Sequence, residues 1–330
     1  MRELQEFYEP NKVLHREEEL NIISNLFEDF QTNGYSTKNL AILGKTGSGK
    51  SLVINKIKKK YDNYLYASAS ITRTTLKTMK SLFNCVYTEE YKVLTTGIEY
   101  LKIHPKIIIV DEVNKIPDIK HFFDNINTIF RETGCPIILI SNKEWILMQM
   151  PEDARLTLFF DIIPFKPYNS DELYDIIKDR KIPDNIPEEA LRHICGVGAS
   201  KGSARIVLKI TSECITKKDY SFETIEEEVK KLEKEDWFSY TNSLNLMEKK
   251  IYSDILEMSN QDYITPLQLK NKSIGLSSSR ISQFIDKFEH DGLINVDWFN
   301  KGVAGGRYRL LTINQPEIVP MLKAILKEIA

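Results

Sequence analysis

The segment GKTGSGKS combines glycine, lysine and serine at a spacing that could bind phosphate groups, because it fits the pattern G-x-x-x-x-G-K-[ST]. In such a loop successive backbone N–H groups turn toward phosphate oxygens, and the following helix adds the positive end of its dipole. Lys50 is expected to reach the β- and γ-phosphates, and the hydroxyl of Ser51 to hold Mg²⁺. With the next residue, the predicted nucleotide-binding loop consists of Gly44, Lys45, Thr46, Gly47, Ser48, Gly49, Lys50, Ser51 and Leu52.

Two further apolar segments lead into polar side chains that could complete such a site. In KIIIVDEVN the apolar run is followed by Asp111 and Glu112, and CPIILISN ends at Asn142. Asp111 is predicted to hold the Mg²⁺ shell, Glu112 to activate the attacking water, and Asn142 to meet the γ-phosphate or that water. Two acids at a strand end mean little alone, but downstream of a phosphate-binding loop they predict phosphate chemistry. Asn142 also fits an ordinary turn at the end of a strand.

The elements that must position these residues alternate between strand and helix in the first half of the chain. Helices are predicted at 17–30, 51–60 and 121–133. This alternation predicts an α/β fold, a parallel five-stranded sheet with helices on both faces. The lysine run KIKKK at 56–60 is interpreted as the solvated face of the helix after the loop. The predicted strands are 40–43, 64–68, 107–110, 137–140 and 159–163.

The strands stop after PFKPY, and helical patterns follow. Asn169, with Glu172 three residues later, has the pattern of a capping box. Further helices are predicted at 187–195, 203–215 and 222–235, and KEDWFSYTNS at 234–243 is predicted to be a linker. The chain is therefore divided into three expected domains: an α/β nucleotide-binding domain at 1–166, a helical lid at 167–237 and a C-terminal domain at 238–330.

The last of these domains has the element order of a winged helix. An amphipathic helix around 247–256, a short helix opened by Pro266 and a third helix from Ser277 or Ser278 to Gly292 precede two strands, LINVDWF and RYRLLTI. A winged helix places its third helix in the major groove of DNA and its hairpin on the flanking backbone. The predicted DNA-binding residues are Ser279, Arg280, Gln283, Lys287, Lys301, Arg307 and Arg309.

The charge of this region gives moderate support to DNA binding. Between residues 266 and 310 seven basic residues stand against four acidic ones, although the whole chain has a formal net charge of −2. A winged helix that docks a protein remains an alternative. Hydrophobic content of 42% and charged content of 28% are typical of a globular protein.

Other sequence features exclude several classes of protein. No apolar stretch is long enough for a transmembrane helix, and the N-terminus lacks an apolar signal core, so a cytoplasmic location without membrane contact is expected. Cys85, Cys135, Cys195 and Cys214 are widely spaced, which favours buried free thiols over disulfides or a zinc site.

The whole chain resembles the archaeal replication initiators of the AAA+ class, the family related to the largest subunit of the eukaryotic origin recognition complex and its licensing partner. EPNKVLHREEEL resembles the lead-in that lines the family's adenine pocket, while GKTGSGKS, VDEVN and ISN match its Walker A, Walker B and sensor 1 segments in order. The segment 152–180 resembles the stretch with the arginine finger and the entrance to the lid, and KGSAR resembles sensor 2.

This resemblance implies roles for four more residues. His15 and Arg16 would belong to the nucleotide site, with ATP or ADP and Mg²⁺ as cofactors. Arg155 would be the finger offered to a neighbouring protomer's ATP, and Arg205 would touch the γ-phosphate of the chain's own ATP, because a guanidinium stabilises charge that develops in phosphoryl transfer. A salt bridge on the surface or in the lid is the alternative for each arginine.

The implied function is a weak switch-type ATPase whose ATP-bound form recognises origin-like duplex DNA, recruits the replicative helicase or other initiator protomers, and is reset by slow hydrolysis. Asn114 and Ser203 replace the acids usual in the family, and the segment 70–106 is short, which favours a divergent or accessory member. Two other functions remain open. One is a mobile-element helper ATPase that binds DNA without sequence preference, and the other is an ATP-regulated switch in transcription or signalling.

Overall fold

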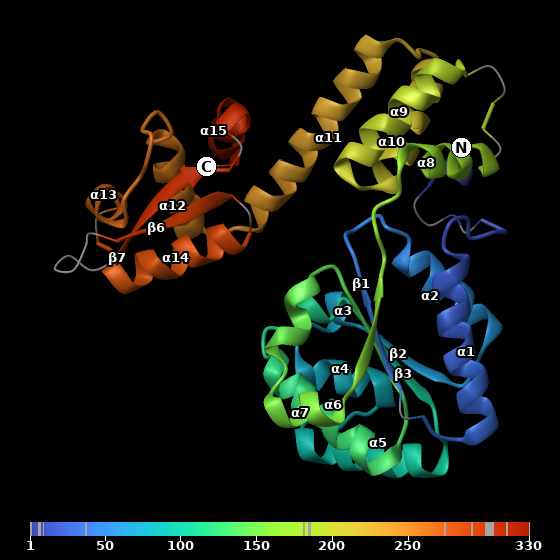
Figure 1. The fold of residues 1–330 in the computed structure, drawn as a ribbon. Coiled ribbons are helices and arrows are strands. Elements are labelled where there is room, and N and C mark those ends of the chain that lie inside the picture. The colour runs from blue at the N-terminus through green and yellow to red at the C-terminus, as the bar shows by residue number, and fades with distance from the viewer. Residues whose placement is uncertain are drawn as a thin grey trace. The chain divides into compact units, whose positions relative to one another are not determined.

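The computed structural model divides into two compact units, Met1–Ile225 and Glu226–Ala330, and each is described by itself (Figure 1). The predicted boundaries at 166 and 237 remain predictions. The structure describes residues 2–5, 8, 10–36, 38–180, 182–183, 186–273, 275–291, 293–300, 307–314 and 316–329.

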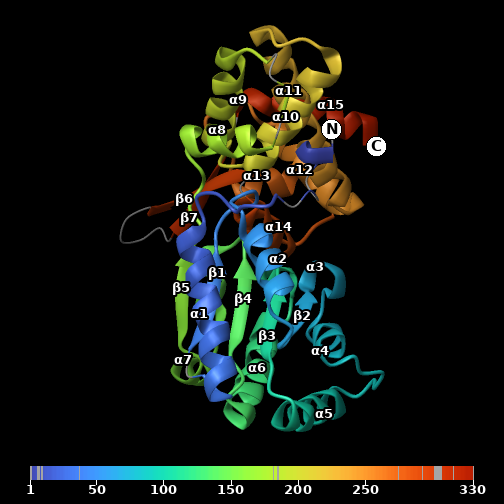
Figure 2. The ribbon, with the colours of Figure 1, turned by 90° about the vertical axis from the view of Figure 1, so that its right-hand side faces the viewer.

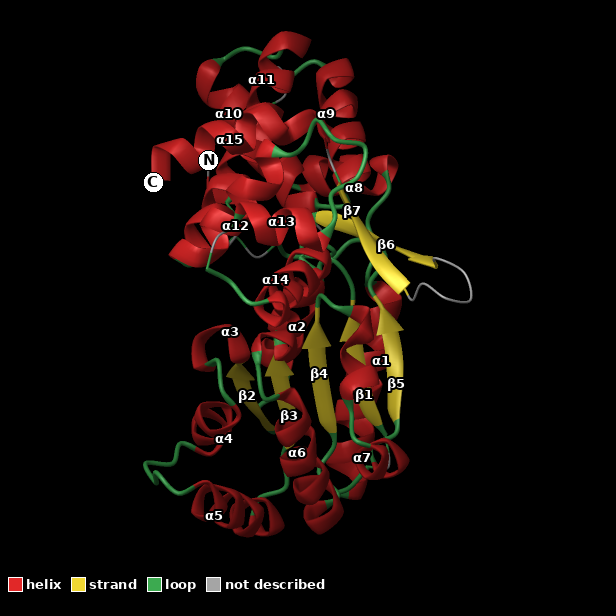
Figure 3. Ribbon diagram, turned by 90° about the vertical axis from the view of Figure 1, so that its left-hand side faces the viewer, coloured by secondary structure: helices red, strands yellow, loops and turns green. Residues whose placement is uncertain are grey.

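The first unit is built on the parallel five-stranded sheet that the sequence predicted, and its strand order is β2-β3-β4-β1-β5 (Figure 3). The three central strands are apolar and almost entirely buried because helices cover both faces. Edge strand β5 is more exposed and ends in a proline. Proline cannot donate a ladder hydrogen bond, and at a sheet edge that bond is not needed. The strands are β1 (Asn39–Leu43), β2 (Tyr64–Ser68), β3 (Ile107–Asp111), β4 (Ile137–Ser141) and β5 (Phe160–Pro164), the last beginning one residue later than predicted.

Helices pack on the two faces of this sheet (Figures 1 and 2). Helices α1 and α2 lie on one face, and α4, α6 and α7 lie on the other. Phe27, Ile54, Phe122 and Ile126 are almost completely buried in the resulting core. The helices of this layer are α1 (Glu17–Asn33), α2 (Lys50–Lys60), α3 (Ala69–Thr72), α4 (Thr75–Phe83), α5 (Glu90–Ile103), α6 (Ile119–Thr133) and α7 (Glu152–Thr157), with short 3₁₀ turns η1 (Arg2–Leu4), η2 (Val113–Lys115) and η3 (Glu144–Gln149).

Three helices follow the sheet and form the lid of the first unit: α8 (Ser170–Asp179), α9 (Glu188–Lys201) and α10 (Ala204–Lys217). The predicted capping box is present, since Asn169 Oδ1 accepts from the Glu172 amide at 2.9 Å and Glu172 Oε2 accepts from the Asn169 amide at 2.8 Å. The helices pack so closely that a Cβ on Gly198 would lie 2.0 Å from Val207 Cγ2.

The predicted linker at 234–243 is wrong, because these residues continue helix α11 (Phe222–Ser243). The segment contains no glycine or proline that would end a helix. Trp237 and Tyr240 instead pack against the core of the second unit, and Thr241 Oγ1 donates to the Trp237 carbonyl at 2.8 Å. The polar composition that suggested a linker belongs to the exposed side of an amphipathic helix.

The second unit has the predicted winged-helix order. Its third helix buries Ile281, Phe284, Ile285 and Phe288, and Ser277 caps that helix by accepting from the Arg280 amide at 3.2 Å. Gly292 and the turn at 301–306 lie outside the described residues. The elements are α12 (Leu246–Glu257), α13 (Pro266–Lys272), α14 (Ser278–His290), the antiparallel strands β6 (Ile294–Asn300) and β7 (Arg307–Ile313), turn η4 (Pro316–Ile318) and helix α15 (Val319–Ile329), which was not predicted.

The structure also bears on the expectations about membrane-spanning helices and cysteines. Within the described part of the chain, no helix is both long enough and apolar enough to cross a bilayer. All four cysteines are free thiols. Cys135, Cys195 and Cys214 are buried as expected, whereas Cys85 is only partly buried.

Candidate nucleotide site and DNA-binding surface

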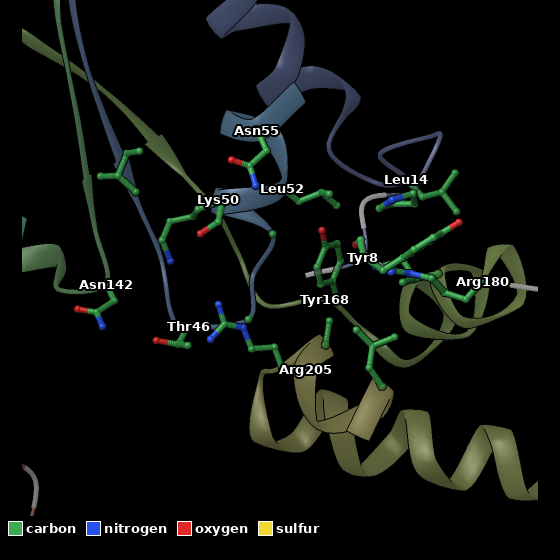
Figure 4. Close-up of a pocket in the computed structure, with 18 of the residues that line it drawn as sticks. Tyr8, Leu14, Thr46, Lys50, Leu52, Asn55, Asn142, Tyr168, Arg180 and Arg205 are labelled. Atoms are coloured by element: carbon green, nitrogen blue, oxygen red, sulfur yellow. Dashed lines mark hydrogen bonds between the residues drawn. The ribbon is translucent and has the colours of Figure 1, made fainter. Parts of the chain in front are cut away.

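A pocket opens where the loop after β1 meets the ends of β3 and β4, the N-terminal segment and the lid. Figure 4 shows two ends to this pocket. Thr46, Lys50, Asn142 and Arg205 gather at one end, which we call the phosphate end. Tyr8, Leu14, Tyr168 and Arg180 lie at the other end, which we call the base end. The pocket is also lined by Pro10, Lys12, Ile176, Asp179 and Leu208.

The loop between β1 and α2 needs glycine because of its backbone conformation and because it leaves no space for side chains. Gly47 and Gly49 have φ angles of 85° and 96°, in the left-handed region that side chains rarely adopt. A Cβ on Gly47 would lie 2.3 Å from Ser203 Oγ, and one on Gly49 would lie 2.4 Å from the Tyr168 hydroxyl. The Ala204 amide also donates to the Gly47 carbonyl at 3.3 Å. The loop therefore packs directly against the start of lid helix α10.

Lys50 is the buried cation of the phosphate end. Its Nζ donates to the carbonyl of Gly44 at 2.5 Å and to that of Lys45 at 2.8 Å. Burial lowers the pKa of Lys50 to about 8; Asp111 opposes this shift, and the nearby positive charge of Arg205 adds to it. Two cations that disfavour each other's charge at one end of a pocket form a site suited to an anion.

Asp111 and Glu112 line the same end from the carboxyl end of β3. Asp111 Oδ1 accepts from the Glu112 amide at 2.8 Å, and its Oδ2 accepts from the Tyr66 hydroxyl at 3.2 Å. Burial raises the pKa of Asp111. Glu112 has a φ of 54°, a left-handed conformation that is costly for a residue with a side chain and concentrates at functional sites. The structure therefore brings both predicted acids to the pocket and fixes the first of them.

Asn142 lies at the end of β4, beside Asn114 from the segment after β3. Asn114 Oδ1 accepts from the Ser141 hydroxyl at 3.2 Å and lies 3.5 Å from the Asn142 amide, linking the ends of β3 and β4. Asn142 Oδ1 is buried and has no hydrogen-bond partner in the structure. A buried amide oxygen without a partner among the described residues can accept a hydrogen bond from a ligand or water.

The donors at the phosphate end suit Mg²⁺ only if a phosphate is also present. The described residues contain no group of three or more His, Cys, Asp or Glu side chains that could hold a metal ion. Ser51 and Asp111 both line the pocket and offer a hydroxyl and a carboxylate. Mg²⁺ is usually held by one or two carboxylates together with substrate phosphates, so this donor set fits that ion.

Several predicted nucleotide-binding residues do not line the pocket: Gly44, Lys45, Ser48, His15 and Arg16. Lys45 is exposed on the loop, while Ser48 is fully buried. His15 Nε2 instead lies 3.0 Å from Asp175 Oδ2 on α8. Arg155 does not line the pocket either, and its Nη2 donates to the carbonyls of Met148 and Met150.

Arg16 lies behind the loop and connects it to the lid. Its Nε donates to the Ser48 carbonyl at 3.0 Å, and its Nη2 donates to the Lys166 carbonyl at 2.5 Å. The guanidinium lies 3.9 Å from the centre of the Tyr168 ring. With 5% of its surface exposed, Arg16 supports the loop and is not placed to touch a ligand in the pocket.

The sequence reasoning missed most of the pocket lining beyond the phosphate end. Leu14, Pro10 and Lys12 lie inside the segment that resembled an adenine pocket, but Ile176, Asp179, Arg180 and Leu208 come from lid helices. Their apolar and charged types are common on any helix, so no local signal marks them. Asn55 could have been predicted to line the pocket, because it lies four residues after Ser51 and therefore on the same face of α2.

Predicted DNA-binding residues lie on the exposed side of α14 and on the hairpin. Ser279, Arg280 and Gln283 are exposed, and Arg280 Nη1 donates to Gln283 Oε1 at 2.8 Å. Trp298 and Phe299 on β6 are also exposed, and the sequence reasoning did not single them out. Lys301 and the side chain of Arg307 lie outside the described residues.

Two of the predicted basic contacts are paired within the second unit. Lys287 Nζ lies 2.7 Å from Glu248 Oε1, and Arg309 Nη1 lies 2.5 Å from Asp286 Oδ1. Arg309 also stacks over Trp298, 4.7 Å from the ring centre. Arg309 therefore joins the hairpin to α14, and the positive charge open to DNA is smaller than the residue count indicated.

The sheet order, the glycine-rich loop and the helical lid define an AAA+ fold, and a winged-helix domain follows it in the chain. No model of a known protein family matches the sequence. The chain is 24% identical to ORC1-type DNA replication protein 2 of Saccharolobus solfataricus, over 94% of this chain and 88% of that protein. It is 25% identical to ORC1-type DNA replication protein 1 of Archaeoglobus fulgidus, over 96% of this chain and 88% of that protein.

Solved structures show the same fold over nearly the whole chain. The Aeropyrum pernix ORC1 protein in complex with DNA matches with a TM-score of 0.79 and 17% identity, covering 99% of this chain and 95% of that one. Cdc6p from Pyrobaculum aerophilum matches with a TM-score of 0.59 and 16% identity, covering 99% and 97% of the two chains. The chain is therefore similar in sequence to archaeal ORC1-type DNA replication proteins and shares its fold with solved ORC1 and Cdc6 structures.

Proposed function

We propose that this protein is an ATP-controlled replication initiator that reads duplex DNA at origin-like sites. The observation that carries the proposal is the convergence of Lys50 and Arg205 at the phosphate end of a pocket closed by the lid, in a chain that also has a winged helix. The likeness to ORC1-type DNA replication proteins over more than nine-tenths of the chain supports it. Recruitment of the replicative helicase is part of the same proposal.

At the phosphate end each group has a distinct task. The Lys50 ammonium exchanges its two carbonyl acceptors for β- and γ-phosphate oxygens, and Arg205 contacts the γ-phosphate from the lid. Bound Mg²⁺, held by Ser51 and Asp111, would neutralise phosphate charge. Glu112 accepts a proton from the attacking water, and Asn142 orients that water. Arg155 completes the site of a neighbouring protomer, and ATP turnover is slow.

Nucleotide binding near pH 8 is expected to take up protons. Burial leaves Lys50 about half neutral at pH 8, and a bound phosphate raises its pKa again, so binding draws roughly half a proton from the buffer at that pH. Affinity should be nearly constant below pH 7 and should fall as pH rises above 8. Calorimetric titration in buffers of different ionisation enthalpy measures the uptake, and identical heats in all buffers would contradict it.

DNA recognition is assigned to the exposed side of α14. Arg280 on this helix donates to an uncharged side chain, Gln283, whereas Lys287 is paired with the carboxylate of Glu248. An arginine in the major groove can form two hydrogen bonds to guanine, which discriminates against the wrong base by about 1–3 kcal/mol. The hairpin is expected to lie on the adjacent backbone.

Replacing Arg280 with alanine tests this assignment. The variant should bind its best duplex site roughly ten- to a hundredfold more weakly while its affinity for random DNA changes much less. Lys250→Ala removes one positive charge from an exposed position on α12 and serves as the matched control. Fluorescence anisotropy at physiological salt measures both. Equal weakening on specific and random DNA would contradict base reading by Arg280.

A further inference from the structure

The N-terminal segment, residues 3–15, is fastened to lid helix α8 at two separate points. Arg180, which ends α8, donates from Nη1 to the carbonyls of Glu3 at 3.0 Å and Tyr8 at 3.2 Å. His15 Nε2, at the other end of the segment, lies 3.0 Å from Asp175 Oδ2 within α8. Between these points Pro10, Lys12 and Leu14 line the pocket, and Leu14 lies at its base end.

Arg180 is unusual for an arginine on a small helical lid. It is 6% exposed, and its guanidinium lies 5.1 Å from the centre of the Tyr8 ring. Burial lowers the pKa of Arg180, and the neighbouring Asp179, Tyr8 and Tyr168 oppose that shift. A buried guanidinium is retained only where hydrogen bonds offset its lost hydration, and here the acceptors are backbone carbonyls of the N-terminal segment.

These contacts give the base end a wall that neither the sheet nor the loop supplies. Tyr8 lines the pocket, and its carbonyl and ring are both engaged by Arg180. Figure 4 shows Tyr8, Leu14 and Arg180 together, away from Lys50 and Asn142. The position of Tyr8 at the pocket therefore depends on the end of α8.

We propose that Arg180 is a positioning residue for nucleotide binding, which clamps the N-terminal segment to α8 and so forms the base end of the pocket. This inference rests on the proposed nucleotide-binding function. It assigns Arg180 a role distinct from that of Arg205, because the base end contacts the part that ATP and ADP share. The apparent dissociation constant rises in inverse proportion to the fraction of molecules whose binding-competent form is assembled.

The clamp predicts how variants should affect nucleotide binding. Arg180→Ala is expected to weaken ATP and ADP binding by a similar factor, roughly tenfold, if about nine molecules in ten lose the assembled wall. Arg205→Ala should weaken ATP more than ADP, because it acts at the γ-phosphate. Arg192→Ala, on the exposed surface of α9, is the matched control and should leave both affinities unchanged. Arg180→Lys keeps the charge and a donor, and should fall between wild type and alanine.

A truncated protein separates the clamp from a direct contact between Arg180 and nucleotide. Removing residues 1–8 deletes both carbonyl acceptors, so the truncation alone should reproduce the tenfold loss, and adding Arg180→Ala should then change little. Calorimetry or competition with a fluorescent ATP analogue measures the cycle. Additive effects would overturn the clamp in favour of direct contact. An affinity within twofold of wild type in Arg180→Ala, or a loss confined to ATP, would overturn it as well.

Hydrogen exchange in the absence of nucleotide gives a second readout that a general loss of stability would not reproduce. Arg180→Lys and Arg180→Ala should speed amide exchange in residues 2–8 while α1 and α6 exchange at wild-type rates. Unchanged exchange in residues 2–8 would overturn the clamp. Wild-type protein that binds neither ATP nor ADP would instead overturn the proposed function, and the positioning role with it.

Discussion

Lys50→Ala is expected to raise the dissociation constants of ATP and ADP at least about a hundredfold. The substitution removes a buried ammonium that would face the phosphates. Removing one partner of a buried pair of opposite charges costs roughly 3 kcal/mol or more of binding free energy. The fold should survive, because alanine leaves only the Gly44 and Lys45 carbonyls without this donor, at the edge of a solvated pocket. Calorimetric titration, with thermal unfolding as a check of folding, measures the loss.

Lys45→Ala is the control that the structure offers for this experiment. Lys45 lies five residues earlier in the same loop but is exposed and does not line the pocket. Its removal changes the net charge by the same amount and should alter nucleotide affinity less than about threefold. Equal losses in the two variants would mean that general electrostatic attraction, and not the buried position of Lys50, drives binding.

Glu112→Gln is expected to separate hydrolysis from binding. The amide cannot accept a proton from water, and loss of a positioned general base typically lowers the rate about 10²- to 10⁴-fold. ATP affinity should stay within about threefold of wild type, because Asp111, Ser51 and Lys50 are unchanged. Single-turnover hydrolysis of radiolabelled ATP measures the slow rate directly.

Glu99→Gln provides the comparison for this variant, since Glu99 is an exposed acid on α5 in the same unit. It should hydrolyse ATP at the wild-type rate. If Glu112→Gln also retained the wild-type rate, Glu112 would not be the base. Loss of ATP binding in Glu112→Gln would show that its charge holds the bound nucleotide or its metal ion.

The sheet and the phosphate end were predictable because local rules determine them. Apolar runs of about five residues mark strands buried on both faces, and the phosphate-binding pattern states which backbone positions need glycine. Asp111 and Glu112 follow one such apolar run, and Asn142 follows the next. Parallel strands bring their carboxyl ends to one edge, so these residues meet although about 30 residues separate the last two.

The base end and the charge balance of the winged helix were not predictable, because they depend on contacts between distant segments. Arg180 meets Glu3 and Tyr8 across more than 170 residues of sequence, and Lys287 meets Glu248 across 39. A count of basic residues treats Lys287 as an available positive charge, whereas in the structure it forms a salt bridge with Glu248. The linker prediction failed for a related reason, since the packing of Trp237 on the second unit extends α11 through a polar segment.

The central claim is that nucleotide state controls sequence-specific DNA binding. The most direct measurement is the affinity of the wild-type protein for a library of source-genome and random duplex fragments, with ATP and with ADP, at physiological salt. A nucleotide-controlled initiator is expected to bind a few fragments tightly, with affinities that differ at least about fivefold between ATP and ADP. Binding that is uniform, scales with fragment length and is the same with ATP and ADP would contradict it and would favour a mobile-element ATPase that binds DNA regardless of sequence.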